Sequence, residues 1–191
     1  LNWLGAWNVA GGAVGWFSET VESGKYLDAV MTDSNGLRLT SVFQYANTYA
    51  AFLMAFLFVA LFALIRSKKW YVTVAHSFML VPIMISLLLT LSRGGLVMLP
   101  VVFVLLLLFQ KPSRQILWII HLVFAALSSL AVISKVTSIG KHLALVPDAS
   151  AAVEGWSWLL VSCMVTAAAS WAVQHFIASR LEKRLENGST R

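Results

Sequence analysis

Two arginines stand beside long apolar segments, and arginine is well suited to bind a phosphate group in such a place. Arg93 lies in the stretch "TLSRGG", residues 90–95, between uncharged apolar runs on both sides. Arg38 lies in "GLRLTSVFQYAN", residues 36–47, which leads directly into another apolar run. A guanidinium group presents forked donors that match phosphate oxygens, and it stays charged at physiological pH. The two arginines are therefore candidates to hold an anionic ligand at one mouth of a helix bundle.

Polar side chains accompany both arginines. Ser86 and Thr90 precede Arg93 by seven and three residues, so on a continuous helix all three share one face. Asn47 begins the apolar run after Arg38, where an asparagine can cap the first turn of a helix. A competing interpretation treats Arg93 as an anchor that extends its charge to the lipid headgroups, and Arg38 as an ordinary loop charge.

Five apolar runs dominate the chain and predict helices that cross a membrane. The 191 residues are 59% hydrophobic and only 12% charged, whereas soluble domains carry about 25% charged residues. Runs of about 18 or more apolar residues are typical of membrane spans. We therefore expect an all-α, polytopic transmembrane helix bundle, with kinks at Pro82 and Pro100. The expected spans cover residues 46–65, 70–92, 94–110, 115–134 and 155–179.

Membrane topology explains the excess of basic residues, so a nucleic-acid partner is not expected. The formal net charge is +6, and nine of the fourteen lysines and arginines fall in three clusters between or after the runs. Helices that alternate in direction place these clusters on one side of the membrane, and positive charge marks the cytoplasmic side. The nine residues are Arg66, Lys68, Lys69, Lys111, Arg114, Arg180, Lys183, Arg184 and Arg191.

This topology divides the chain into three parts. Residues 1–45 form an outer-face segment, in which a possible end of a preceding span or an interfacial stretch is followed by a polar loop with a turn signal at residues 34–36. Residues 46–179 form the transmembrane bundle, and residues 180–191 form a basic cytoplasmic tail. Residues 135–154 are expected to form a second outer loop. Because the chain begins with Leu rather than Met, we expect a fragment of a longer polytopic protein.

Metal binding and proton relay have no support inside the apolar runs. No run contains Asp or Glu, and these are the residues that intramembrane proton relays and hard-cation sites require. We therefore expect no metal site inside the runs. His76, His121 and His175 lie near the inner ends of their spans, and we interpret them as packing or interfacial residues. His142 is the only outer histidine, and an ordinary loop role is the simpler interpretation.

Small polar residues in the last run indicate a packing surface. Ser162, Thr166 and Ser170 recur every four residues, which places them on one helix face. Such a face lets two membrane helices approach closely. The single cysteine, Cys163, has no partner in the chain, and we interpret it as a small buried apolar residue.

The two arginine-containing stretches resemble motifs of the O-antigen ligase and polymerase superfamily of membrane glycosyltransferases. "RLTSVFQYAN", residues 38–47, is similar to that family's Arg-x-x-Gly-x-Phe-x-Asn-Pro-Asn stretch, and "TLSRGG" is similar to its Thr-x-Ser-Arg-Gly/Ala motif. The resemblance covers residues 36–135. Ser41 stands where the family often has glycine, and Tyr45 and Ala46 stand where it often has asparagine and proline.

The resemblance implies a GT-C-like architecture and an enzyme that works on the outer face of the cytoplasmic membrane. Its donor is a glycan on undecaprenyl diphosphate, which it transfers without a metal or other cofactor to an acceptor glycan or lipid. Carried over to this chain, Arg38 and Arg93 are the catalytic residues, because they hold the diphosphate and stabilise the charge that develops on it. The residues expected to bind substrate beside them are Asn47, Ser92, Thr90 and Ser86.

The acceptor half of the site is expected to lie outside this chain. The family uses a large outer loop that commonly carries a histidine thought to activate the acceptor. Here His142 is the one outer candidate, and its loop is short, so we expect the large loop beyond Arg191. The fragment alone should then be inactive.

Three alternatives to a ligase stay open on the sequence. A repeat-unit polymerase of the same superfamily differs from a ligase in its acceptor, which this sequence does not report. A non-catalytic transporter segment for lipid-linked glycans would use the arginines to guide anionic headgroups and would need no acceptor base. The third alternative is a structural membrane segment that contains no binding or catalytic site.

Overall fold

Helices make up most of the chain in the computed structural model, which describes residues 2–17 and 29–181. Most of the predicted polar loop, at residues 18–28, and the tail at residues 182–191 lie outside the described residues. The elements are α1 (Asn2–Trp16), β1 (Val30–Asp33), β2 (Gly36–Leu39), the 3-10 turn η1 (Ser41–Phe43), α2 (Ala46–Arg66), α3 (Trp70–Phe78), α4 (Leu80–Leu89), α5 (Arg93–Leu108), α6 (Pro112–Leu143), α7 (Ala149–Val173) and the π-helical turn η2 (Gln174–Ala178).

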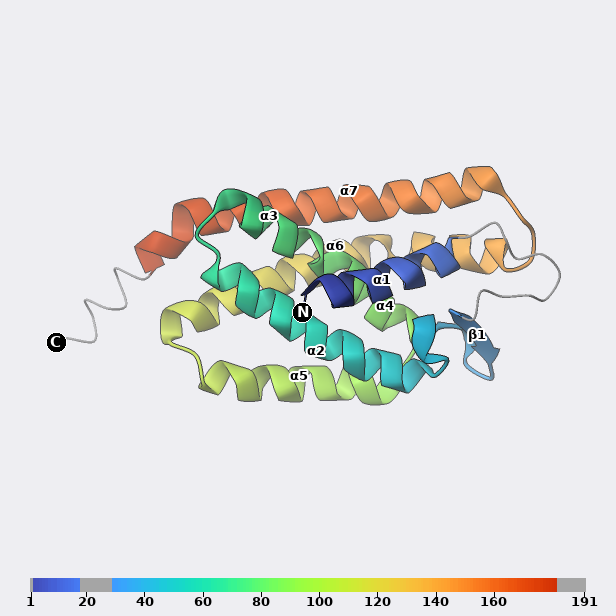
Figure 1. Cartoon of the computed structure of the whole chain (residues 1–191), viewed down its shortest axis with the longest axis horizontal. Coiled ribbons are helices and arrows are strands. Elements are labelled where there is room, and N and C mark those ends of the chain that lie inside the picture. Colours follow the sequence, from blue (N-terminus) through green and yellow to red (C-terminus); the bar gives the residue numbers. More distant parts are fainter. Residues whose placement is uncertain (1, 18–28, 182–191) are drawn as a thin grey trace.

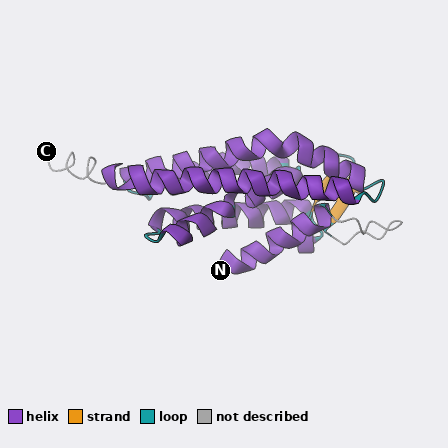
Figure 2. Cartoon of the chain, turned by 90° about the horizontal axis from the view of Figure 1, so that it is seen from above, coloured by secondary structure: helices purple, strands orange, loops and turns teal. Residues whose placement is uncertain are grey.

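The long helices lie side by side and run back and forth along the molecule (Figure 1). Seen from above, they form one elongated bundle with the β-hairpin at one end (Figure 2). In the described part of the chain, four segments are long and apolar enough to cross a membrane, namely Ala46–Arg66, Trp70–Leu89, Pro112–Leu143 and Ala149–Leu181. The chain thus has the architecture of a multi-pass helical membrane protein.

The fifth predicted span, residues 94–110, is helical but short. Its helix, α5, has 16 residues, which correspond to ~24 Å, whereas the hydrocarbon core of a bilayer measures about 30 Å. α5 lies along α2 at the edge of the bundle (Figure 1), and none of its residues is buried. Large apolar side chains such as Val97 and Leu108 are exposed on it. α5 therefore presents an apolar surface to its surroundings without reaching the length of the other spans.

Proline explains a break in the second predicted span. α3 ends at Phe78, and α4 begins at Leu80. Pro82 has no N–H to donate to the carbonyl of Phe78 four residues earlier, and its ring crowds that turn. The predicted distortion at Pro82 is thus confirmed, whereas Pro100 lies inside α5, which remains a single helical element.

Residues 135–154 are mostly helical, so the prediction of an outer loop there was wrong. α6 continues to Leu143 and α7 begins at Ala149, which leaves a connection of residues 144–148. Lysines and small polar residues lower the hydropathy of this stretch and hide its helical periodicity. The buried positions nevertheless follow helical spacing and are Val136, Ile139, Gly140 and Leu143.

The N-terminal helix packs against α2, α4 and η1, and at its C-terminal end the chain also contacts the end of α6 and the start of α7. The indole Nε1 of Trp16 donates to the carbonyl of Val136 at 3.0 Å. Gly140 leaves room for the indole ring, because a Cβ there would lie 2.3 Å from it. The ring of Phe17 lies 5.4 Å from the ring of Trp156. α1 is therefore an integral part of the bundle.

A β-hairpin precedes α2, and the sequence predicted its turn but not its strands. β1 and β2 pair antiparallel, with Asp33 opposite Gly36. The Asp33 carboxylate accepts a hydrogen bond from the N–H of Asn35 at 2.7 Å. Gly36 has a φ of 103°, in the left-handed region that favours glycine. The turn predicted at residues 34–36 is confirmed.

The small polar residues of α7 form the predicted packing surface against α6. The hydroxyl of Thr166 donates to the hydroxyl of Ser128 at 2.7 Å. The hydroxyl of Ser170 lies 3.1 Å from Nδ1 of His121, which is fully buried. Ser162 is also buried on this face. Both the small-residue interface and the packing role of His121 are confirmed.

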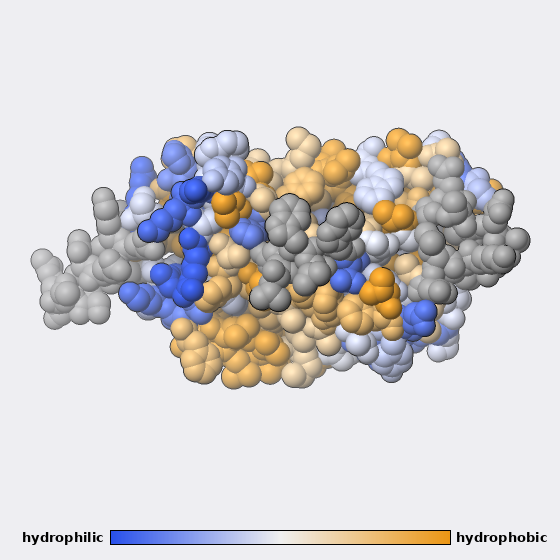
Figure 3. Space-filling view, in the orientation of Figure 1, coloured by the Kyte–Doolittle hydropathy of each residue, from blue (hydrophilic) through white to orange (hydrophobic). Residues whose placement is uncertain are grey.

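Hydrophilic residues gather toward the ends of the molecule, and hydrophobic residues cover much of the surface between them (Figure 3). The first two predicted basic clusters and the start of the third share one end of the bundle. The described basic residues at that end are Arg66, Lys68, Lys69, Lys111, Arg114 and Arg180. The described basic residues in the other half of the bundle are Arg38, Arg93, Lys135 and Lys141.

Candidate functional site

Arg38 lies at the centre of a polar cluster where the hairpin meets the helix bundle. Its side chain is only 11% exposed. Nε donates to the carbonyl of Thr90 at 2.7 Å, and Nη1 donates to the carboxylate of Asp33 at 2.7 Å. Nη2 donates to Oδ1 of Asn47 at 3.3 Å. One guanidinium group thus connects β1, the end of α4 and the start of α2.

Asn47 joins the cluster through its side chain, not as the helix cap that the sequence predicted. Tyr45 is the residue that precedes the first turn of α2, and it makes no side-chain capping bond. The amide of Asn47 instead accepts from Arg38, and its Nδ2 donates to the Tyr45 hydroxyl at 3.3 Å. Asn47 is exposed, so it remains accessible to a ligand at this end of the bundle.

Asp33 is a member of the cluster that sequence reasoning missed. Its carboxylate pairs with Arg38 at 2.7 Å. The hydrogen bond from Arg38, followed by that from the N–H of Asn35, lowers the pKa of Asp33 below its usual value. The acids of the outer segment appeared scattered in the sequence. The available signal was the turn after Asp33, because a tight hairpin folds the chain back and brings a residue beyond the turn close to one before it.

Arg93 does not continue the helix that carries Ser86 and Thr90, which corrects the predicted shared face. α4 ends at Leu89, and Leu91 adopts a φ of 50°, in the left-handed region that ends many helices. Arg93 is then the first residue of α5. Ser86 is buried inside the bundle, whereas Arg93 is exposed at its surface.

Thr90 and Ser92 form the turn that presents Arg93. The Thr90 hydroxyl donates to the carbonyl of Leu87 at 2.7 Å and accepts from the N–H of Ser92 at 3.2 Å. The Ser92 hydroxyl accepts from the N–H of Gly95 at 3.2 Å and so caps α5. Both hydroxyls are buried and serve the backbone, so they position Arg93 and are poorly placed to bind substrate directly.

Backbone strain is concentrated beside the arginines. Within the described ranges, the non-glycine residues with positive φ are Ser41 (49°), Gln44 (53°) and Leu91 (50°). Each costs of order 1–2 kcal/mol relative to an ordinary backbone conformation. Ser41 and Gln44 follow Arg38, and Leu91 precedes Arg93. Gln44 and Leu91 follow the ends of η1 and α4, where a left-handed residue commonly ends a helix, so the strain belongs to the turns beside the two arginines.

His142 is not joined to this cluster by any described contact. It lies on the last turn of α6, and its Nε2 is 3.2 Å from the carboxylate of Asp148. Asp148 also caps α7 by accepting from the N–H groups of Ser150 and Ala151. Hydrogen bonds from the Ser150 hydroxyl, the Ala151 N–H and His142 lower the pKa of Asp148 to about 2. The histidine is thus tied to the α6–α7 connection.

No family model, curated protein or solved structure matches this chain. The resemblance to the O-antigen ligase and polymerase superfamily therefore depends on the two motifs themselves. A function for the cluster around Arg38 and Arg93 must likewise be inferred from the geometry and chemistry of these residues.

The arrangement is suited to bind an anion at the surface of the bundle. Arg93 is an exposed cation at the N-terminal end of α5, where the helix dipole also favours negative charge. Arg38 has more N–H groups than its bonds to described residues use. Among the described residues, no group of three or more His, Cys, Asp or Glu side chains could hold a metal ion.

Proposed function

We propose that this chain is the donor-binding part of a membrane glycosyltransferase similar to the O-antigen ligases. Such an enzyme transfers a glycan from undecaprenyl diphosphate to an acceptor on the outer face of the cytoplasmic membrane. The observation that carries the proposal is the bonding of Arg38 to both Thr90 and Asn47. The two segments on which the resemblance depends thus meet at one end of the bundle, 52 residues apart in sequence.

Backbone conformation in the first segment also supports the proposal. Ser41, which stands where the family often has glycine, has a φ of 49° that favours glycine. Ala46, which stands where the family often has proline, is the first residue of α2, the helical position that proline favours. Tyr45 replaces an asparagine at the capping position, where asparagine is among the preferred residues. The departures change residue types but keep the backbone that the motif suits.

The proposed roles of the two arginines differ because their surroundings differ. Arg93 is exposed and would bind the diphosphate directly, together with the first N–H groups of α5. Arg38 is held by Thr90 and Asp33 and would act mainly by positioning the turn before Arg93. As the acceptor hydroxyl gives its proton to a base of the acceptor half and its oxygen bonds to the sugar, the bond from the sugar to the diphosphate breaks. Its electron pair stays on the diphosphate oxygen, where a fixed guanidinium stabilises the added charge.

The test is glycan transfer by the full-length protein reconstituted with a glycan on undecaprenyl diphosphate. We expect Arg93→Lys and Arg93→Ala both to reduce transfer about a hundredfold, the usual effect of removing one preorganised donor. Lysine keeps the charge but loses the planar fork. Lys141→Ala, which removes an exposed cation from the last turn of α6, should leave transfer unchanged.

The outcomes separate the proposal from its alternatives. Near-normal transfer by Arg93→Lys would support a membrane anchor, because lysine reaches the headgroups as arginine does. Binding of the diphosphate lipid without any transfer, in a protein that contains the large outer loop, would favour a transporter. The acceptor that receives the glycan, a lipid core sugar or another glycan chain, distinguishes a ligase from a polymerase.

A further inference from the structure

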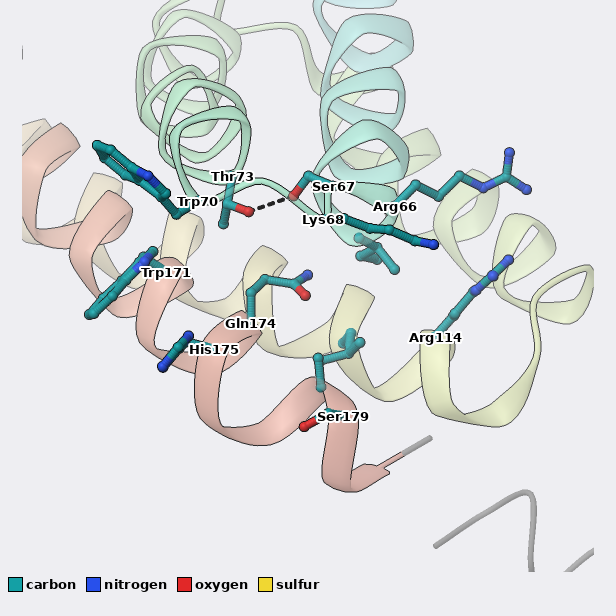
Figure 4. Close-up of a pocket in the computed structure, with 13 residues that line it drawn as sticks. Arg66, Ser67, Lys68, Trp70, Thr73, Arg114, Trp171, Gln174, His175 and Ser179 are labelled. Carbon is teal, nitrogen blue, oxygen red and sulfur yellow. Dashed lines mark hydrogen bonds between the residues drawn. The ribbon is translucent and has the colours of Figure 1, made fainter. Parts of the chain in front are cut away.

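A basic cavity opens at the end of the bundle opposite Arg38. It has a volume of about 550 Å³ and lies where α2, α3, α6 and α7 come together. Arg66, Lys68 and Arg114 line it, and its lining contains no Asp or Glu. Figure 4 shows these three side chains on the same side of the cavity, from the end of α2, the α2–α3 connection and the first turn of α6. This part of the molecule is therefore complementary to an anion.

An apolar groove of about 1010 Å³ adjoins this cavity along α3 and α7. The basic cavity and the apolar groove are both lined by Lys68, Trp70, Trp171 and His175. The rings of Trp171 and His175 stack at a centroid distance of 5.4 Å and form a common wall. The groove then continues over apolar side chains, among them Val74, Phe78 and Met164. Both α3 and α7 belong to candidate membrane spans, so the groove runs along helices that are long and apolar enough to cross a membrane.

Helix ends of both kinds meet at the cavity. α3 and α6 begin beside it, whereas α2 ends at Arg66 and η2 ends at Ala178, both of which line it. The helix dipoles therefore oppose one another there, and the positive potential comes from the basic side chains. Arg66 lies over the ring of Phe62, 4.0 Å from its centroid, which holds its charge at the rim.

We propose that the basic cavity and the apolar groove together bind one anionic phospholipid. The headgroup phosphate lies among Arg66, Lys68 and Arg114, and an acyl chain lies along the groove between α3 and α7. A free phosphate would use the cations but not the apolar groove. A zwitterionic phospholipid would use the groove and also carries a phosphate, but its headgroup ammonium would be repelled by the three cations that line the cavity. This lipid site is separate from the proposed transferase site, which lies at the other end of the bundle.

Native mass spectrometry of the purified protein in neutral detergent tests the site, with phosphatidylglycerol and phosphatidylcholine of identical chains as probes. The wild type should retain phosphatidylglycerol in preference to phosphatidylcholine. The pair Lys68→Gln and Arg114→Gln should weaken phosphatidylglycerol binding about 30-fold, since each basic side chain near anionic lipid contributes about a factor of five. The matched pair Lys135→Gln and Lys141→Gln removes two exposed charges from the opposite half of α6 and should change binding less than about twofold.

Two further measurements keep the test decisive if the cavity variant folds poorly. The pair Lys68→Arg and Arg114→Lys keeps both charges and should retain phosphatidylglycerol, whereas added salt should weaken binding to the wild type. Glycerol phosphate, the soluble headgroup, should compete at least a hundredfold less well than the lipid. Equal retention of both lipids, or equal losses in the two glutamine pairs, would overturn the proposal. Competition by glycerol phosphate as strong as that by the lipid would instead assign a soluble anion to the cavity.

Discussion

The Nε atom of Arg38 donates to the main-chain carbonyl of Thr90 at 2.7 Å, and this bond joins residues that are 52 positions apart. Thr90 stands at the C-terminal end of α4, where helices leave carbonyls without intrahelical partners. A positive charge at this end also complements the helix dipole. Arg38 is thus a C-terminal cap for α4, and it fixes the turn that leads to Arg93.

Replacement of Arg38 by lysine should therefore destabilise the protein. The ammonium group can still pair with Asp33 but loses the forked geometry that also reaches Thr90 and Asn47. Hydrogen bonds from charged groups contribute about 1.5–3 kcal/mol each, so we expect Arg38→Lys to lower the free energy of unfolding by about 2–4 kcal/mol. Thermal unfolding in detergent measures the loss. Arg93→Lys is the matched control and should change stability by less than about 0.5 kcal/mol, because Arg93 is exposed.

The connection between α6 and α7 should respond to acid through Asp148. Its pKa is lowered to about 2 from the usual 3.8, so the ionised carboxylate stabilises the folded state above about pH 4. This contribution is lost as the pH falls from about 4 through 2. Asp148→Asn can still cap α7 but does not titrate. The wild type should have the higher unfolding temperature at pH 6, and the difference should shrink by pH 3. A constant difference between pH 6 and pH 3 would contradict this role.

The contact between α1 and α6 should be intolerant of one added methyl group. A Cβ at Gly140 would lie 2.3 Å from the indole ring of Trp16, which is rigid and buried. Gly140→Ala should therefore destabilise the protein by about 1–3 kcal/mol through overpacking. Gly11→Ala is the control, because nothing lies within 4 Å of a Cβ there. It should be neutral or stabilising by up to about 1 kcal/mol, since alanine favours helix over glycine.

The sequence predicted the features that depend on local composition and spacing. Apolar runs located the helices, Pro82 located a break, and the turn after Asp33 was expected. The spacing of Ser162, Thr166 and Ser170 predicted the face of α7 that packs against α6. In each case the signal lies within a few residues of the feature that it predicts, so a single sequence can carry it.

Other features depend on contacts between distant segments or on unusual backbone choices. The change of direction after Thr90 uses a left-handed leucine, Leu91, where glycine would have been the visible signal. The pairing of Asp33 with Arg38 requires the hairpin to be known first. The end of α6 packs against Trp16 of α1 at Gly140, a contact across more than a hundred residues. Hydropathy reports none of these contacts.

Orientation in the membrane is the last prediction, and it follows from the charge at the two ends of the bundle. Phe109 lies in the connection between α5 and α6 at the basic end, and Leu145 lies in the connection between α6 and α7 at the other end. Each is 84% exposed, so the two positions are matched for access to a reagent. Cysteines at these positions, in a Cys163→Ala background that removes the buried thiol, can be labelled with an impermeant thiol reagent.

We expect Leu145→Cys to be labelled from outside in intact cells, and Phe109→Cys only after the membrane is permeabilised. The basic end should face the cytoplasm because positive loops are retained there. This orientation places Arg38 and Arg93 on the outer face, where the proposed transfer requires them. The opposite labelling pattern would put both arginines on the cytoplasmic side, and an outward-facing transferase would then be untenable. The proposal of a lipid site would still stand after that result, because its cations and groove require only that the leaflet on their own side contains anionic lipid.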